Sequence, residues 1–432
     1  MNSGNPSWDS SIEVASLSDV GMRRTNNQDN LAISLSASPE SWQKKGHLFV
    51  VADGMGAHAA GELASKIAVD QIPHLYARSS EASAPEALKK AVVDANSEIN
   101  RRGQANEDFH NMGTTLSSLV LLPQGAVAAH VGDSRVYRLR QNRLEQLTFD
   151  HSLVWEMKAA GQLTAQEEAQ GKIPKNVITR SLGPYPECKV DLEGPFPAAV
   201  GDSFLLCSDG LTGVITDGEI AALLSNMPPA EAVKVLVDLA NLRGGPDNIT
   251  VIIAKIAGPE IATAGNAKAI RVNSKKSEYS VHPLVWAFFG VSLLLVFFFL
   301  MMKQWIPATV PGLIALGTGG FALIRMLMGA TSGQAVAQGK ALGKGPYTRT
   351  TCGSGAEVAK QLAAILKQLQ MGAVEQDWKV DWKKLKAMVA DAESALKQGN
   401  PSHAVRVYGR SISFLMDQLR NQHGESSSSI DL

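Results

Sequence analysis

Cysteine is scarce in this sequence of 432 residues, with Cys188, Cys207 and Cys352 as its only three copies. They lie far apart, so they form no zinc-ligand spacing and do not suggest a disulfide framework. A reducing compartment is the simplest interpretation. Cys207 follows two leucines and is expected to be a small hydrophobic residue of the core.

An excess of either charge is also lacking, because 41 Lys and Arg residues balance 41 Asp and Glu residues. A chain without a basic field is not expected to bind nucleic acid. The first ten residues are polar, so we expect no cleavable signal peptide. The length predicts two or three domains.

What the sequence does contain is a recurring acidic residue at the end of an apolar run. Residues 50–56, Val-Val-Ala-Asp-Gly-Met-Gly, predict a buried strand that ends at Asp53 in a tight turn. One such Asp-Gly pair is usually only a turn. Here the pattern recurs at junctions between β-rich runs and turns, around Asp29, Asp133, Asp209 and Asp247.

If these strand ends meet, Asp29, Asp53, Asp209 and Asp247 converge without a lysine among them. Repulsion between such carboxylates makes bound cations necessary. Oxygen ligands suit Mg²⁺ or Mn²⁺ better than Zn²⁺. Two ions about 3.5–4 Å apart can share a bridging hydroxide as nucleophile. Arg24 would then be a natural fork for a phosphate group.

The order of elements predicts an α+β fold. Strand patterns at 12–18, 31–33 and 48–51 precede two consecutive helical stretches, at about 61–76 and 84–101, and further strands follow. This order argues against alternating βαβ units. The irregular stretch 150–185 is typical of a mobile flap beside a site.

Six motifs together resemble the metal-dependent serine/threonine protein phosphatases of type 2C, in their bacterial form. The resemblance covers about residues 12–257. It implies a four-layer α-β-β-α sandwich with metals at its end, and hydrolysis of phosphoserine and phosphothreonine by a metal-bridging hydroxide. The motifs are Arg24-x-x-Asn27-Gln28-Asp29, Val51-Ala52-Asp53-Gly54-Met55-Gly56-Ala57-His58-x-x-Gly61-Glu62, Met112-Gly113-Thr114-Thr115, His130-Val131-Gly132-Asp133-Ser134-Arg135, Ser208-Asp209-Gly210-Leu211 and Asp247-Asn248-Ile249-Thr250.

The resemblance implies a role for each acidic residue of the core site. Asp53 would bridge the two core metals, joined by the backbone carbonyl of Gly54. Asp209 and Asp247 would complete the ligand set of the first metal, and Asp29 would contact the metals through bound water.

Further roles follow from the same resemblance, with two departures. Asp133 would serve a third metal together with Asp209, and Arg24 would hold the substrate phosphate. Gln28 stands where many members carry Glu, which removes one charge, and Ala57 stands where Gly is commoner. The general acid is open: His58 is a candidate, as is an ordinary turn role for it, and His151 is interpreted as structural.

A hydrophobic hairpin is predicted after the phosphatase-like region. Residues 284–302 are almost wholly apolar, long enough at about 1.5 Å per residue to span a hydrocarbon core of about 30 Å. A second span at 306–328 is interrupted by Pro307 and Pro311, so a single span with a re-entrant segment is the alternative. Basic residues flank the outer ends, which predicts two transmembrane helices in the plasma (inner) membrane with both termini cytoplasmic.

Three helical stripes near the C-terminus predict a small all-α domain, with partner binding or regulation as its open roles. The predicted organisation is a phosphatase domain at 12–257, a flexible linker at 258–281, a transmembrane hairpin at 282–329, a flexible linker at 330–355, a three-helix bundle at 356–423 and a disordered tail at 424–432.

The sequence therefore predicts a membrane-anchored phosphatase that uses Mg²⁺ or Mn²⁺, with phosphorylated proteins, a serine/threonine kinase and the lipid bilayer as partners. One alternative is an inactive or weak phosphatase fold that acts as a binding or signalling scaffold, which Gln28 favours. Another is a sensor whose hairpin gates the flap, although no extracytoplasmic domain is apparent.

Overall fold

The computed structural model describes residues 8–56, 59–81, 83–164, 167, 173–174, 176–264, 270–271, 283–329, 335–336, 342–353 and 355–423. These form two compact units, one from residues 1–268 and 338–432 and the other from residues 269–337. His58 and the predicted disordered tail at 424–432 lie outside the described residues.

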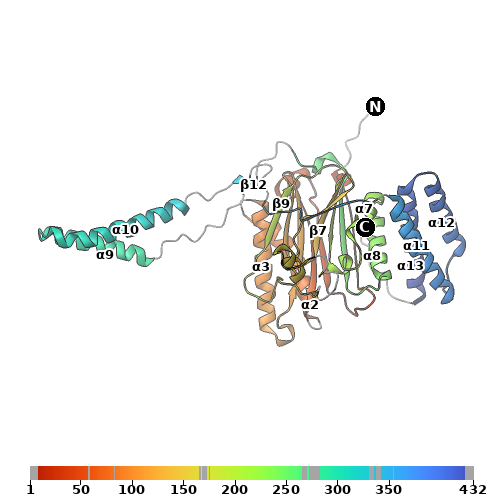
Figure 1. Cartoon of the computed structure of the whole chain (residues 1–432), viewed down its shortest axis with the longest axis horizontal. Coiled ribbons are helices and arrows are strands. Elements are labelled where there is room, and N and C mark those ends of the chain that lie inside the picture. Colours follow the sequence, from red (N-terminus) through yellow and green to blue (C-terminus); the bar gives the residue numbers. More distant parts are fainter. Residues whose placement is uncertain are drawn as a thin grey trace, which may run out of the picture. The chain divides into compact units, whose positions relative to one another are not determined.

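Two antiparallel sheets make up the centre of the first unit (Figure 1). One sheet has the order β1 (Ile12–Asp19), β11 (Ile249–Ile256), β10 (Ser203–Cys207), β7 (Arg135–Arg140), β8 (Arg143–Gln146) and β14 (Thr348–Thr351). The other has the order β2 (Asp29–Ser34), β3 (His47–Met55), β5 (Leu116–Leu122), β6 (Gly125–Val131) and β9 (Asp191–Phe196), with β4 (Gly113–Thr114) paired to β3.

Alternation along the strands builds the layers. In β10, Phe204 and Leu206 point into the cluster between the sheets, where they join Phe49 and Leu119 of the second sheet. Leu205 and Cys207 point the other way, toward helices. A strand with apolar residues on both faces must be covered on both sides, which explains the layered arrangement. The predicted core position of Cys207 is confirmed, since its side chain is fully buried.

Helices cover both outer faces of the sandwich. α2 (Ala60–Arg78) packs on β2 and β3, with α3 (Ala84–Ala105) beside it. α8 (Pro229–Leu242) packs on β1 and β11, next to α7 (Asp217–Asn226). The α+β class with two sheets and flanking helices is confirmed. Shorter elements complete this part: η1 (Trp8–Ser11), α1 (Pro39–Lys45), η2 (Glu107–Phe109), α4 (Leu153–Ala159), α6 (Asp209–Thr212) and η3 (Pro259–Ile261).

The all-helical C-terminal region is present as α11 (Gly355–Glu375), α12 (Trp382–Lys397) and α13 (Pro401–His423). It is not detached from the sandwich, because α13 packs against α7 and α8 (Figure 1). One continuous hydrophobic cluster includes Leu236 of α8 and Leu415 of α13. The helical stripes therefore serve two purposes, closing the bundle and covering the sandwich.

Part of the range predicted as a flexible linker, 330–355, is a β-strand in the structure. Thr348–Thr351 form β14, which pairs antiparallel with β8. The expectation of a linker was wrong for these residues, because a run of Thr and Arg carries no apolar pattern. Its order comes from hydrogen bonds to an open strand edge.

The second unit contains α9 (Pro283–Met301) and α10 (Trp305–Gly329), which pack against each other, and the short pair β12 (Ile270–Arg271) and β13 (Ala335–Val336). The Phe289 ring lies so close to Gly319 that an added Cβ would be 2.8 Å from it. Across the described residues, no helix combines the length and the apolarity that crossing a membrane requires.

Candidate active site

Neighbouring strands bring the first two acidic residues together. Asp29 begins β2 and lies directly opposite Asp53 in the register of β2 with β3. Gly54 follows, and an added Cβ there would lie 2.1 Å from the carbonyl oxygen of Gly61. Only glycine allows the chain to approach α2 so closely at this point.

The other sheet supplies two further carboxylates, and the connection between the two sheets supplies a third. Asp209 follows β10 as the first residue of α6, and Asp247 is separated from the start of β11 by Asn248 alone. Asp133 lies between β6 and β7. The charges of Asp29, Asp209, Asp133 and Asp247 all act on Asp53. The structure therefore brings together all five predicted acidic residues, from both sheets.

Burial and mutual repulsion decide the protonation of this cluster. Removal from water, followed by the charge of Asp29, raises the pKa of Asp53 well above its usual value. Burial raises the pKa of Asp29 to about 7, although a hydrogen bond from Ser208 opposes the shift. Burial and the charge of Asp209 raise the pKa of Asp133 to about 8. Such shifts indicate that burial and repulsion between the carboxylates outweigh the nearby positive charge of Arg135.

Three carboxylate oxygens of the cluster are buried and accept no hydrogen bond from any described residue: Oδ1 of Asp29, Asp133 and Asp209. Buried acceptors of this kind are rare unless a cation or water completes them. The donor set is all oxygen, which suits Mg²⁺ or Mn²⁺. Within the described ranges, no three His, Cys, Asp or Glu side chains form a ready-made metal-binding group.

Arg24 lies at this site, but its partner in the structure is a carboxylate. Its Nη2 donates to Asp247 Oδ2 at 2.8 Å, and half of the Arg24 side chain is exposed. Asp247 thereby holds the guanidinium beside the cluster. The predicted contact of Arg24 with a phosphate group stays a prediction.

Asn248 organises the loops around the carboxylates, a role that was not predicted from the sequence. Its Oδ1 accepts from the Gln28 backbone N–H at 2.8 Å, and its Nδ2 donates to the backbone oxygens of Val20 and Asn26. It therefore ties the Arg24 loop to the start of β11. Its place next to Asp247 was the available signal, since Asn bonds readily to nearby backbone.

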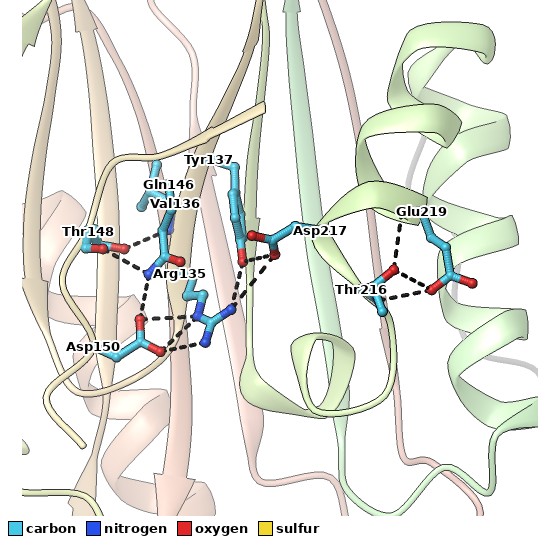
Figure 2. Close-up of polar contacts among 9 residues, drawn as sticks. All are labelled: Arg135, Val136, Tyr137, Gln146, Thr148, Asp150, Thr216, Asp217 and Glu219. Carbon is cyan, nitrogen blue, oxygen red and sulfur yellow. Dashed lines mark hydrogen bonds and ion pairs between the residues drawn. The ribbon is translucent and has the colours of Figure 1, made fainter. Parts of the chain in front are cut away.

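A cleft of about 310 Å³ opens beside the cluster, lined among others by Asp133, Asp209, Arg135, Asp150 and Trp155. Arg135 Nε donates to Asp150 Oδ2 at 2.8 Å, and Arg135 Nη1 donates to Tyr137 Oη at 2.8 Å. Figure 2 shows this guanidinium held between Asp150 on one side and the Tyr137 and Asp217 pair on the other. Arg135 ends the motif at 130–135, and a role for it follows only from these tertiary contacts.

His151 has the structural role that was predicted. Its Nδ1 accepts from the backbone N–H of Gly132 at 3.0 Å, and its Nε2 lies 3.0 Å from Asp191 Oδ2. Its side chain is fully buried. It therefore supports the turn that carries Asp133.

Two antiparallel sheets with helices outside and an acidic cluster at their shared end define the class of metal-dependent protein phosphatases. The profile of the family described as protein phosphatase 2C matches residues 22–238. The chain belongs to this family.

Known protein phosphatases are similar to this chain over slightly more than half of its length. The protein phosphatase PhpP of Streptococcus pneumoniae is 38% identical over 249 residues, which cover 57% of this chain and 98% of the relative. The serine/threonine phosphatase stp of Listeria innocua is 35% identical over 242 residues, which cover 55% and 93%. The solved structure of the Mycobacterium tuberculosis serine/threonine phosphatase PstP/Ppp is 34% identical, with a TM-score of 0.51, and covers 57% of this chain and 99% of that one.

The enzyme class is therefore that of a protein serine/threonine phosphatase, and phosphatases of this family use Mn²⁺ or Mg²⁺. Residues after 238, including β14 and the C-terminal helices, lie outside the family match.

Proposed function

We propose that this chain hydrolyses phosphoserine and phosphothreonine in proteins, with Asp53 and Asp209 as the central carboxylates of the reaction. The observation that carries the proposal is the group of buried, unpartnered oxygens of Asp29, Asp133 and Asp209 beside an open cleft. Charges so placed serve hydrolysis only when cations neutralise them.

The residues would divide the work according to their positions. Asp53, Asp209 and Asp247, with the Gly54 carbonyl, would hold two core ions, and Asp29 would orient their water. Asp133, which lines the cleft together with Asp209, would serve a third ion. When bound, such ions supply an activated water and neutralise charge on the phosphoryl oxygens.

Arg24 would bind the phosphate group, since a guanidinium can hold two phosphoryl oxygens at once. Its hydrogen bond to Asp247 holds the Arg24 side chain beside the cluster. The guanidinium would therefore already lie close to a phosphate group bound there. Arg24 would thereby place the phosphorus atom against the acidic cluster and exclude water from one side of it.

The test is hydrolysis of a phosphothreonine peptide by the full chain, with Mn²⁺ and with a chelator. We expect turnover that needs Mn²⁺ and that Asp209→Asn abolishes. The matched control is Asp94→Asn on α3, whose carboxylate is exposed and pairs with Lys90. No turnover from folded protein at any Mn²⁺ concentration would instead favour the scaffold function, which Gln28 suggests.

We further propose that residues 283–329 anchor the phosphatase to the plasma (inner) membrane, with both termini in the cytoplasm. Large apolar side chains on the two helices are exposed, among them Phe288, Phe297, Leu313 and Leu316. Exposed apolar surface of this extent needs an apolar partner. A serine/threonine kinase of the same pathway would supply the phosphorylated proteins.

Fractionation of cells tests the anchor. We expect the full chain in the membrane fraction, resistant to extraction by high salt, and a variant lacking residues 282–329 in the soluble fraction. A full chain that stays soluble would contradict anchoring and leave the phosphatase proposal intact.

A further inference from the structure

The segment Gly345–Thr351, here called the strap, precedes the C-terminal helices in the sequence and lies along the phosphatase sandwich. Its last four residues are β14, and Tyr347 N–H donates to the Gln146 carbonyl at 2.8 Å. The strap lies outside the part of the chain that matches the family profile.

One buried carboxylate anchors the strap to the other sheet. Glu193 of β9 is 3% exposed, and its Oε1 accepts from Tyr347 Oη at 2.5 Å. Its Oε2 accepts from the Gly345 backbone N–H at 2.9 Å. The strap thus bonds to β8 in one sheet and to β9 in the other, across one side of the sandwich.

The Tyr347 ring continues into a line of aromatic rings. It meets Phe149 edge-on at 5.3 Å between ring centroids, and Phe149 meets Trp155 edge-on at 5.4 Å. Trp155 lines the cleft next to the acidic cluster. Edge-to-face pairs at these distances are attractive and fix ring orientation.

The two residues after Phe149 bind groups that line the cleft or support its lining. Asp150 is almost fully buried and binds the guanidinium of Arg135. His151 exchanges hydrogen bonds with Gly132, the residue before Asp133. A displacement of Phe149 would therefore move a carboxylate and an imidazole that position groups at the site.

We propose that Tyr347 is a positioning residue: its ring holds the 149–155 loop so that Trp155 and Arg135 form the wall of the cleft that receives the peptide around the phosphorylated residue. The inference rests on the proposed function. It predicts that the strap sets the affinity for a phosphopeptide. Hydrolysis of a small aryl phosphate, which has no peptide to contact this wall, should be unchanged.

The experiment compares Tyr347→Ala, Tyr347→Phe and the control Arg349→Ala in the full chain. Arg349 lies in the same strap, two residues after Tyr347, but its side chain is 61% exposed, and it pairs with Glu145 away from the cleft. Each variant is assayed with a phosphothreonine peptide and with p-nitrophenyl phosphate in Mn²⁺. Hydrogen exchange of the 149–155 amides gives a readout that does not depend on activity.

For Tyr347→Ala we expect the KM for the peptide to rise about tenfold, with kcat and both constants for p-nitrophenyl phosphate within about twofold. The 149–155 amides should exchange faster, while those of β5 stay unchanged. Tyr347→Phe keeps the ring and should restore most of the affinity, and Arg349→Ala should behave as wild type.

Equal loss on both substrates together with a lower Tm would overturn the proposal, since that result marks a purely structural role. Unchanged KM and unchanged exchange in Tyr347→Ala would overturn it as well. If the wild-type chain itself shows no turnover, the proposed function fails. The exchange data then decide separately whether Tyr347 holds the loop.

Discussion

At the scale of single residues, the acidic cluster makes the protein without bound metal less stable as the pH rises from about 4 to 7. The pKa of Asp29 is raised to about 7 in the folded state, above its ordinary value of 3.8. The folded state therefore binds more protons than the unfolded state between these values. The stabilising contribution is complete below about pH 4 and is lost as the pH rises through about 7.

We accordingly expect the free energy of unfolding in chelator to fall between about pH 4 and 7, and Asp29→Asn to flatten that slope. Saturating Mn²⁺ should reverse it, because the ions replace protons as the neutralising charge. The measurement is urea unfolding across this pH range. A slope that Asp29→Asn leaves unchanged would refute the assignment.

Arg24 offers a second residue-scale prediction. Replacing it with Ala should raise the KM for a phosphothreonine peptide about tenfold or more, which corresponds to loss of a charge-assisted contact worth about 1.5–3 kcal/mol. Arg24→Lys should recover part of the loss, because an ammonium supplies charge without the two-pronged geometry. Steady-state kinetics in saturating Mn²⁺ would measure both, and equal KM values for wild type and Arg24→Ala would argue against phosphate binding.

At the scale of elements, α13 docks on α8 through a buried ion pair. Asp238 of α8 is fully buried, and its Oδ1 lies 2.8 Å from Arg420 Nη1 of α13. Lys234 is 3.6 Å from the same carboxylate. A buried carboxylate that loses one of its cations is costly even when a second remains.

We expect Arg420→Met to lower the free energy of unfolding by roughly 2–3 kcal/mol, and the added change Asp238→Asn to return part of it. The matched control is Arg410→Met, which breaks an exposed pair with Glu231 on the same two helices and should cost less than about 1 kcal/mol. Urea unfolding of the full chain compares the three. Equal effects of the two Arg variants would mean that Asp238 needs no partner on α13.

At the scale of the whole molecule, we expect removal of the C-terminal helices to destabilise the protein and removal of the second unit to leave its stability unchanged. The C-terminal helices share a hydrophobic cluster with the sandwich, including Leu236 and Leu415. Residues 269–337 form a unit of their own.

Truncation after residue 353 should therefore expose apolar surface on α8, lower the Tm and promote aggregation. Deletion of 282–329 should leave Tm and peptide turnover within error of the full chain. Thermal unfolding and Mn²⁺-dependent hydrolysis measure both. A truncated chain as stable as the full one would show that the shared cluster contributes little.

Much of the site was predictable because its signals are local. Asp53 follows an apolar run and precedes a Gly, so strand, turn and carboxylate are all read from neighbouring residues. The same holds for Asp209 and Asp247. Convergence of these strand ends was expected from the motifs, and the mutual charges of the cluster agree with it.

The strap and the docking of the bundle were not predictable in the same way. Thr348–Thr351 have no apolar alternation, and their order depends on the free edge of β8. Arg420 looks like an ordinary surface residue of an amphipathic helix until α8 presents Asp238 to it.

The sequence by itself determined the family, the strands and turns that carry the carboxylates, and the three C-terminal helices, since each depends on patterns within a few residues. Only the tertiary structure decided that Tyr347 meets Glu193 and Phe149, and that α13 covers α8. These contacts join residues more than 150 positions apart, and their free energy comes from edge pairing and burial that no local pattern encodes.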